Sequence, residues 1–267
     1  MDAGLNNYLK KISSGLFLKY DADERRKIEK SIANISNKLV DYFDDQIDQS
    51  TVFGSYTRDT ILPRQFDQNS DIDILIQFNV NDYEKLRPES YRNQLKRFAE
   101  VNYTYSGIIK DHPSVIIQLQ HIKFDLVPSI FDVGLIYDSI EIPDKDGGWM
   151  ETNPRGFDKK LNGVNSACNS IIKPIIRLLK YWNATHGYPY YSFELESEIA
   201  DMDFNNDNYE SGFLYAIETL SGNGLPLWAR NRLDSAKSSG NWISEYLHRG
   251  EIQKAKSPLD RILPNIC

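Results

Sequence analysis

The sequence is poor in cysteine, has no long apolar run and has no excess of basic residues. Its 267 residues include two cysteines, Cys168 and Cys267, which are too few for a disulfide framework. No segment approaches the roughly 18 consecutive apolar residues of a membrane span. The N-terminus, MDAGLNNYLKK, is polar and charged, unlike a signal peptide. We therefore expect a reduced, cytoplasmic protein with no membrane partner.

The charge balance disfavours a protein whose main task is to bind duplex nucleic acid. Lys and Arg number 31 against 38 Asp and Glu, so the formal net charge is −7. Proteins that grip duplex nucleic acid usually carry a basic excess. The four histidines have no Cys or His neighbours at zinc-finger spacing. We expect no stable binding of duplex DNA, whereas an enzyme that uses small nucleotides with magnesium is compatible with this composition.

Hydrophobic periodicity divides the chain into a mixed part and a helical part. Residues 21–45 predict a helix whose apolar stripe consists of Ile28, Ile32, Ile35, Leu39 and Tyr42. A second helix is expected at 88–101. A short strand is expected in STVFGS (50–55), running into a turn at Gly54. Further strands are expected at 72–78, 114–120 and 121–130, the last closed off by Pro128. After residue 155 the patterns suit helices alone, at 171–185, 192–204, 209–221 and 241–255.

This division predicts an α+β protein with two lobes. A lobe with a mixed sheet would span residues 1–155, and a mostly helical lobe would span residues 156–267. The helix at 21–45 would cross both lobes. A cleft between lobes is a common place for a ligand, so we expect the active site there.

Three aspartates on two of the expected strands point to metal chemistry. Asp71 and Asp73 are two residues apart and therefore project from the same side of a strand. A divalent cation relieves the repulsion between such carboxylates, and magnesium prefers oxygen ligands. Asp125 lies on another strand, and if the two strands pair, the three carboxylates could hold two metal ions. The alternative for Asp71 and Asp73 is a solvated strand edge, but a carboxylate among apolar residues, as at Asp125, needs a partner.

Gly54 and Ser55 follow the first expected strand. Glycine lets backbone N–H groups approach a phosphate closely, and a short helix after the turn would aim its positive end at that phosphate. An ordinary turn is the alternative.

These motifs together resemble the nucleotidyltransferase superfamily of the DNA polymerase beta type. Within it they are most similar to the bacterial cGAS/DncV-like nucleotidyltransferases, the CD-NTases of anti-phage (CBASS) signalling. The resemblance rests on segments spread over most of the chain in the order of that family: GSYTRDT (54–60), SDIDILI (70–76), FDLVPS (124–129), TNP (152–154), IRLLKYWN (176–183) and SFELE (192–196).

The resemblance implies a role for the aspartates and the turn. Asp71 and Asp73 would ligate two Mg²⁺ ions, with Mn²⁺ as a substitute. Asp125 would bind one metal and activate the attacking sugar hydroxyl. Gly54 and Ser55 would hold the triphosphate.

Further nucleotide contacts follow from the same resemblance. Lys180 would reach the phosphates from the helical lobe and Ser192 would bind the terminal phosphate. A solvated lysine and a helix N-cap are the respective alternatives. Arg58 would neutralise the triphosphate or merely solvate its loop. A base could stack on Tyr56, Tyr188, Tyr190 or Tyr191, and we favour Tyr191.

The implied activity is the joining of two or three nucleoside triphosphates, ATP and GTP among them, into a cyclic second messenger with release of pyrophosphate. A downstream effector would respond to the product, and the enzyme would act as a monomer. Two alternatives remain: a nucleotidyltransferase that modifies tRNA or protein, and a catalytically silent nucleotide-binding protein. The sequence does not fix the bases, the linkage, the ring size, the activating signal or the effector.

Overall fold

The computed structural model describes residues 4–80, 85–132 and 139–264, and it divides the chain into two compact units. The helical unit comprises Met1–Tyr20, Asp59–Gln68 and Lys159–Cys267. The sheet unit comprises Asp21–Arg58 and Asn69–Asp158. This division does not test two predictions. They are the lobe boundary between residues 155 and 156 and the crossing of both lobes by the helix at 21–45.

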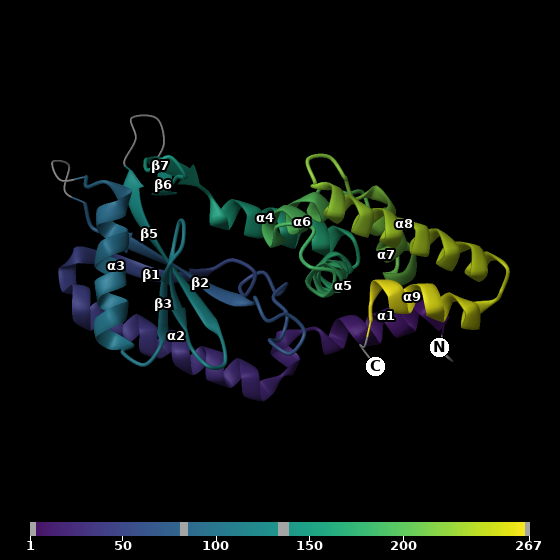
Figure 1. The fold of residues 1–267 in the computed structure, drawn as a ribbon, viewed down its shortest axis with the longest axis horizontal. Coiled ribbons are helices and arrows are strands. Elements are labelled where there is room, and N and C mark those ends of the chain that lie inside the picture. Colours follow the sequence, from purple (N-terminus) through teal and green to yellow (C-terminus); the bar gives the residue numbers. More distant parts are fainter. Residues whose placement is uncertain (1–3, 81–84, 133–138, 265–267) are drawn as a thin grey trace. The chain divides into compact units, whose positions relative to one another are not determined.

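The sheet unit is built on one mixed sheet. Its strands are β1 (Ile47–Phe53), β2 (Asp71–Phe78), β3 (Gly107–Lys110), β4 (Val115–Gln118), β5 (Lys123–Asp132), β6 (Ser139–Pro143) and β7 (Trp149–Thr152). The order is β1-β2-β5-β4-β3, with β6 pairing β5 and β7 pairing β6. Figure 1 draws the strands as arrows. The pair β2 and β5 is parallel, and the other pairs are antiparallel. The predicted mixed sheet of an α+β protein is confirmed.

Helices cover one face of this sheet. They are α2 (Ala22–Phe43), which the short turn η2 (Asp44–Gln46) follows, and α3 (Pro88–Asn102). Ile72, Ile74, Ile76 and Phe78 of β2 alternate onto that face and are buried. The ring of Phe78 contacts Phe43 of α2 and Tyr91 of α3. The alternation leaves the acidic residues of β2 on the opposite face.

Two of the differences between this unit and the sequence prediction have a direct physical reason. In α2 the stripe ends on buried Phe43, while Tyr42 is 40% exposed, because four residues after Leu39 complete the helical turn better than three. Pro128 does not close the strand, since β5 continues to Asp132. Pro128 lies between Leu126, which pairs with β4, and Ile130, which pairs with β6, so its missing N–H interrupts neither of those ladders.

The helical unit is built around α5 (Ile172–Thr185), which is buried along most of its length. Its other elements are α1 (Gly4–Gly15), η1 (Leu18–Tyr20), α6 (Ser192–Ala200), α7 (Tyr209–Thr219), α8 (Leu227–His248), η3 (Ile252–Ala255) and α9 (Lys256–Ile262). The helix α4 (Pro154–Ala167) contributes residues to both units.

The helix predicted at 241–255 is wrong at both ends. α8 begins at Leu227 and ends at His248. Gly250 adopts a left-handed conformation with a φ of 72°. The N–H of Glu251 donates to Tyr246 and the N–H of Gly250 donates to Leu247, which closes the helix with a Schellman motif.

Among the described residues, no helix combines the length and the apolar character that a membrane span requires.

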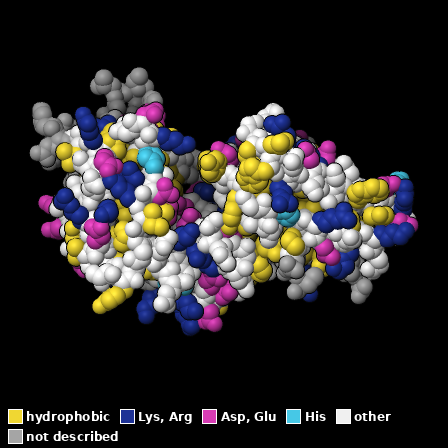
Figure 2. Space-filling model, viewed as in Figure 1, with side chains coloured by type: hydrophobic (Ala, Val, Ile, Leu, Met, Phe, Trp, Pro, Cys, Tyr) yellow, Lys and Arg dark blue, Asp and Glu magenta, His cyan; other side chains and the backbone are white. Residues whose placement is uncertain are grey.

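On the face drawn in Figure 2, basic and acidic side chains are interspersed on each unit.

Candidate active site

The acidic residues of β2 and β5 share one face of the sheet. In the parallel register Asp73 lies opposite Asp125, and Asp71 lies opposite Lys123. Residues two apart on a strand, and residues opposite one another on paired strands, project to the same side. The register therefore places Asp71, Asp73 and Asp125 on the face that is turned away from α2 and α3.

Asp125 has an environment that favours its protonated form. Its Oδ2 accepts a hydrogen bond of 3.1 Å from the hydroxyl of Ser114 on the segment that leads into β4. Its Oδ1 is buried and has no hydrogen-bond partner within the described residues. Burial, and then the negative charge of Asp71, raise the pKa of Asp125 to about 7. A carboxyl group of this pKa can take up and release a proton near neutrality.

Gly54 lies directly against Asp73. β1 ends at Phe53, which pairs with Asp73, and the next residue, Gly54, has a φ of 80°. A Cβ atom at this position would lie 2.9 Å from Cγ of Asp73, and nearer still to Oδ2. The site accordingly has space for glycine alone, with the backbone against a carboxylate.

The turn after Gly54 is short. The hydroxyl of Thr57 and the N–H of Arg58 both donate to the carbonyl of Gly54, at 3.0 and 3.2 Å. The short helix that the sequence suggested after this turn does not form, because the chain makes a single turn and then continues without regular structure. Ser55 and Tyr56 are half-buried in this turn.

Arg58 is held by the first turns of α4. Its guanidinium group lies 3.4 Å from a carboxylate oxygen of Asp158 and 5.2 Å from the ring centre of Phe157. Only 7% of Arg58 is exposed. Arg58 therefore ties the turn after Gly54 to α4 within the sheet unit.

The remaining predicted contacts belong to the helical unit. Lys180 of α5 is buried, and its Nζ lies 2.9 Å from Oε1 of Glu196 on α6. The hydroxyl of Thr60 donates to the same oxygen at 2.9 Å. The alternative of a solvated Lys180 is wrong, since a buried lysine needs such a partner. Glu196 lies within the SFELE segment, and no role was predicted for it.

Tyr191 and Ser192 lie at the start of α6. Tyr191 occupies the N-cap position and is 79% exposed, and Ser192 is the first helical residue and is also exposed. The alternative of Ser192 as the N-cap is therefore off by one residue. Among the neighbouring tyrosines, Tyr190 is buried and donates to the carbonyl of Ser221, while Tyr188 donates to Asp67. Of the tyrosines at 188–191, Tyr191 has the ring face most accessible to a base.

The carboxylate oxygens on the acidic face of the sheet are of the chemical type that binds a divalent cation. One of them, Oδ1 of Asp125, is buried and unpaired within the described residues. Hard oxygen donors of this type suit magnesium. In the part of the chain that the structure describes, no three His, Cys, Asp or Glu side chains are already gathered as a metal-binding group.

Solved structures of similar architecture define the class of fold. CdnG of Bradyrhizobium diazoefficiens, a CD-NTase solved with GTP, has a TM-score of 0.73 at 11% identity, covering 97% of this chain and 94% of that one. CdnC of E. coli MS115-1, solved in a complex with HORMA-deltaN, has a TM-score of 0.72 at 15% identity, covering 100% and 99%. The fold is that of the CD-NTases.

The sequence then gives the family. The sequence profile of the Second Messenger Oligonucleotide or Dinucleotide Synthetase domain (SMODS) matches residues 4–165. This match covers more than half of the chain, and the chain belongs to that family.

Two curated relatives match this chain over part of its length and part of their own. A cyclic AMP-AMP-AMP synthase of Acinetobacter sp. is 30% identical over 178 residues, which are 62% of this chain and 50% of that protein. A probable cyclic nucleotide synthase of Bacillus cereus is 30% identical over 91 residues, which are 33% of this chain and 27% of that protein. The matched regions thus span half, or less, of these relatives.

Replacement of Gly54 by alanine tests the close approach to Asp73. Gly147, in the turn between β6 and β7, also has a positive φ, of 86°, but a Cβ there would meet nothing within 4 Å. Gly147→Ala therefore reports backbone strain alone, on the order of 1 kcal/mol. We expect Gly54→Ala to lower the free energy of unfolding by roughly 1–3 kcal/mol more than Gly147→Ala, as measured by urea denaturation. Equal losses would show that Asp73 does not crowd Gly54.

Replacement of Asp125 by asparagine tests the raised pKa. A carboxyl group whose pKa is raised in the folded state stabilises the fold below its ordinary pKa of 3.8, and loses that contribution as pH rises through about 7. Asparagine stays neutral. Relative to wild type without metal, Asp125→Asn should therefore gain about 2–3 kcal/mol of unfolding free energy between pH 5 and pH 8. A difference between the two proteins that does not change with pH would contradict the raised pKa.

Proposed function

We propose that this protein is a nucleotidyltransferase that joins nucleoside triphosphates into a cyclic di- or trinucleotide second messenger. The register that sets Asp73 opposite Asp125, with Asp71 on the same face, carries this proposal. Membership of the synthetase family supports it.

The proposed reaction moves one nucleotidyl group at a time. A sugar hydroxyl oxygen of the acceptor nucleotide attacks the α-phosphorus of a donor triphosphate. The bond from that phosphorus to the bridging oxygen breaks, and pyrophosphate leaves with the electron pair. The linear product then turns over. A second attack of the same kind closes a dinucleotide ring, or it adds a third nucleotide before a third attack closes the ring, and each attack releases one pyrophosphate.

Asp125 accepts the proton of the attacking hydroxyl in this proposal. Its pKa of about 7 leaves a useful fraction ionised at neutral pH, and Ser114 orients one of its oxygens. Asp71 and Asp73 would hold two magnesium ions, with Asp125 sharing one of them. Bound there, the ions would neutralise charge on the triphosphate and on the attacking and leaving oxygens.

The turn after β1 supplies the triphosphate contacts of the sheet unit. The backbone of Gly54 and the hydroxyl of Ser55 bind phosphate oxygens, and Arg58 holds their turn against α4. Phosphate contacts of Lys180 and Ser192 belong to the same proposal, and within the helical unit Glu196 and Thr60 fix the position of Lys180. Tyr56 and Tyr191 offer rings to a base.

The curated relative of Acinetobacter is named for a product of three adenylates, so ATP is the substrate to test first. A role in anti-phage signalling through a separate effector, and action in the cytoplasm as a monomer, belong to the same proposal.

Incubation of the purified protein with ATP, GTP, CTP, UTP and Mg²⁺ tests the activity. Mass spectrometry should detect a cyclic product of two or three nucleotides, with pyrophosphate released. The double variant Asp71→Asn, Asp73→Asn should lower the rate by at least 1,000-fold, because it removes the acidic centre. Label that accumulates on added tRNA or on protein instead would contradict second-messenger synthesis, as would nucleotide binding without turnover under any metal or activator.

A further inference from the structure

The start of β1 carries a bulge that gathers polar side chains at the end of β2. Ile47 pairs with Phe78, and Gln49 pairs with Gln77, so Asp48 is an extra residue between them. In such a bulge two residues face one residue of the partner strand, which re-aims a side chain. Here both Asp48 and Gln49 reach Gln77, which is buried on the acidic face of the sheet.

The order of the hydrogen bonds fixes how these amides point. A carboxylate only accepts, so Asp48 holds the amide nitrogen of Gln77 at 3.1 Å. Oε1 of Gln77 then faces Gln49 and accepts from its Nε2 at 3.0 Å. This relay uses one N–H of Gln49, and it uses neither the second N–H nor the Oε1. Gln49, which is exposed, thus presents an adjacent donor and acceptor in a set orientation.

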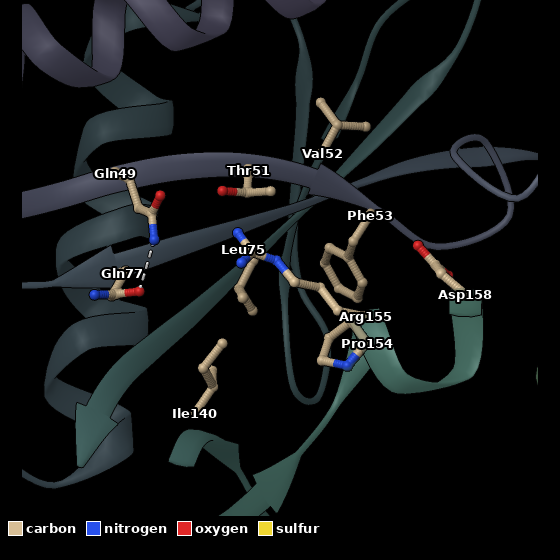
Figure 3. Close-up of a pocket in the computed structure, with 10 residues that line it drawn as sticks. All are labelled: Gln49, Thr51, Val52, Phe53, Leu75, Gln77, Ile140, Pro154, Arg155 and Asp158. Atoms are coloured by element: carbon tan, nitrogen blue, oxygen red, sulfur yellow. Dashed lines mark hydrogen bonds between the residues drawn. The ribbon is translucent and has the colours of Figure 1, made fainter. Parts of the chain in front are cut away.

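These amides lie at a pocket of about 180 Å³ within the sheet unit (Figure 3). Its lining also includes the flat groups of Phe53 and Arg155, with Leu75 and Ile140 as apolar walls. A cavity of roughly 150 Å³ holds a benzene ring. The pocket therefore suits a single planar heterocycle and is too small for a whole nucleotide.

The pocket adjoins the acidic residues along the same face of β2. Asp71, Asp73, Leu75 and Gln77 alternate onto that face, and the last two line the pocket. The rise of a strand puts Leu75 about 7 Å and Gln77 about 13 Å from Asp73. A nucleoside with its sugar hydroxyl at the carboxylates would place its base further along the strand, toward the pocket.

We propose that this pocket holds the nucleobase of the acceptor nucleotide. The proposal rests on the proposed function and adds where the acceptor lies. Gln49 bonds the polar edge of the base through its donor and acceptor, as glutamine amides bond base edges elsewhere. Phe53 and Arg155 supply flat surfaces for the base. Gln77 and Asp48 are positioning residues, because they act by orienting Gln49.

Replacement of Gln49 by leucine tests this site. Gln118→Leu, at the exposed last residue of β4, is a matched control outside the pocket. With the nucleotides that wild type uses, Gln49→Leu should raise KM by on the order of 10-fold to 100-fold, with a much smaller change in kcat. The base composition of the product should also become less selective when all four triphosphates compete. Asp48→Asn should show the same pattern more weakly. An asparagine can donate as well as accept, so it no longer fixes which way the amides of Gln77 and Gln49 point.

The outcomes separate this proposal from the proposed function. If wild type and Gln49→Leu make the same product with the same KM, while the aspartate double variant makes none, the pocket assignment is overturned and the activity stands. If wild type makes no product, the side-chain amide signals of Gln49 and Gln77 decide by NMR. A shift of the Gln77 signal on addition of ATP, GTP, CTP or UTP that Gln49→Leu abolishes and Gln118→Leu keeps supports a base site. No shift with any of the four overturns it.

Discussion

The parallel pairing of β2 with β5 is the constraint on which the candidate site depends. In this register Ile72 lies opposite Phe124 and Ile74 lies opposite Leu126, and all four side chains are fully buried on the helix-covered face. A slip of one residue would turn these apolar side chains outward, so burial fixes the register strongly. The same register forces Asp125 beside Asp73 and near Asp71. Hydrophobic burial on one face thereby holds together carboxylates that repel one another on the other.

The polar face of β2 carries the residues proposed for metal binding and those of the base pocket one after another along the strand. Asp71 and Asp73 stand at its beginning, Leu75 follows, and Gln77 ends it within the relay of Asp48 and Gln49. Gly54 brings the adjacent turn against Asp73. Proton transfer, phosphate binding and base recognition would thus use one rigid sheet, which keeps their separations fixed.

The features that the sequence predicted are those set by local patterns. The alternation in IDILIQF separates a buried face from an acidic face without knowledge of any partner strand. The helix α1 was not predicted, although Leu5, Leu9 and Ile12 fall on one stripe and are buried. The helix α4 was not predicted either, although Phe157, Leu161 and Val164 fall at helical spacing, and of its residues Leu161 alone is buried.

The local sequence pattern does not predict features that depend on strand pairing or on contacts between residues distant in the sequence. The bulge at Asp48 exists only in the register between β1 and β2. The partner of Lys180 is 16 positions away on another helix. The passage of β5 through Pro128 depends on where β4 begins, opposite Leu126, and where the pairing with β6 ends, opposite Ile130.

The most direct measurement of the central claim is the titration of the Asp125 carboxyl by carbon NMR without divalent metal, in wild type and in Asp71→Asn. We expect a pKa of about 7 in wild type and a lower value in the variant, because the charge of Asp71 contributes to the increase. A wild-type pKa at the ordinary value of 3.8, or one that does not respond to removal of the Asp71 charge, would contradict the convergence of these carboxylates.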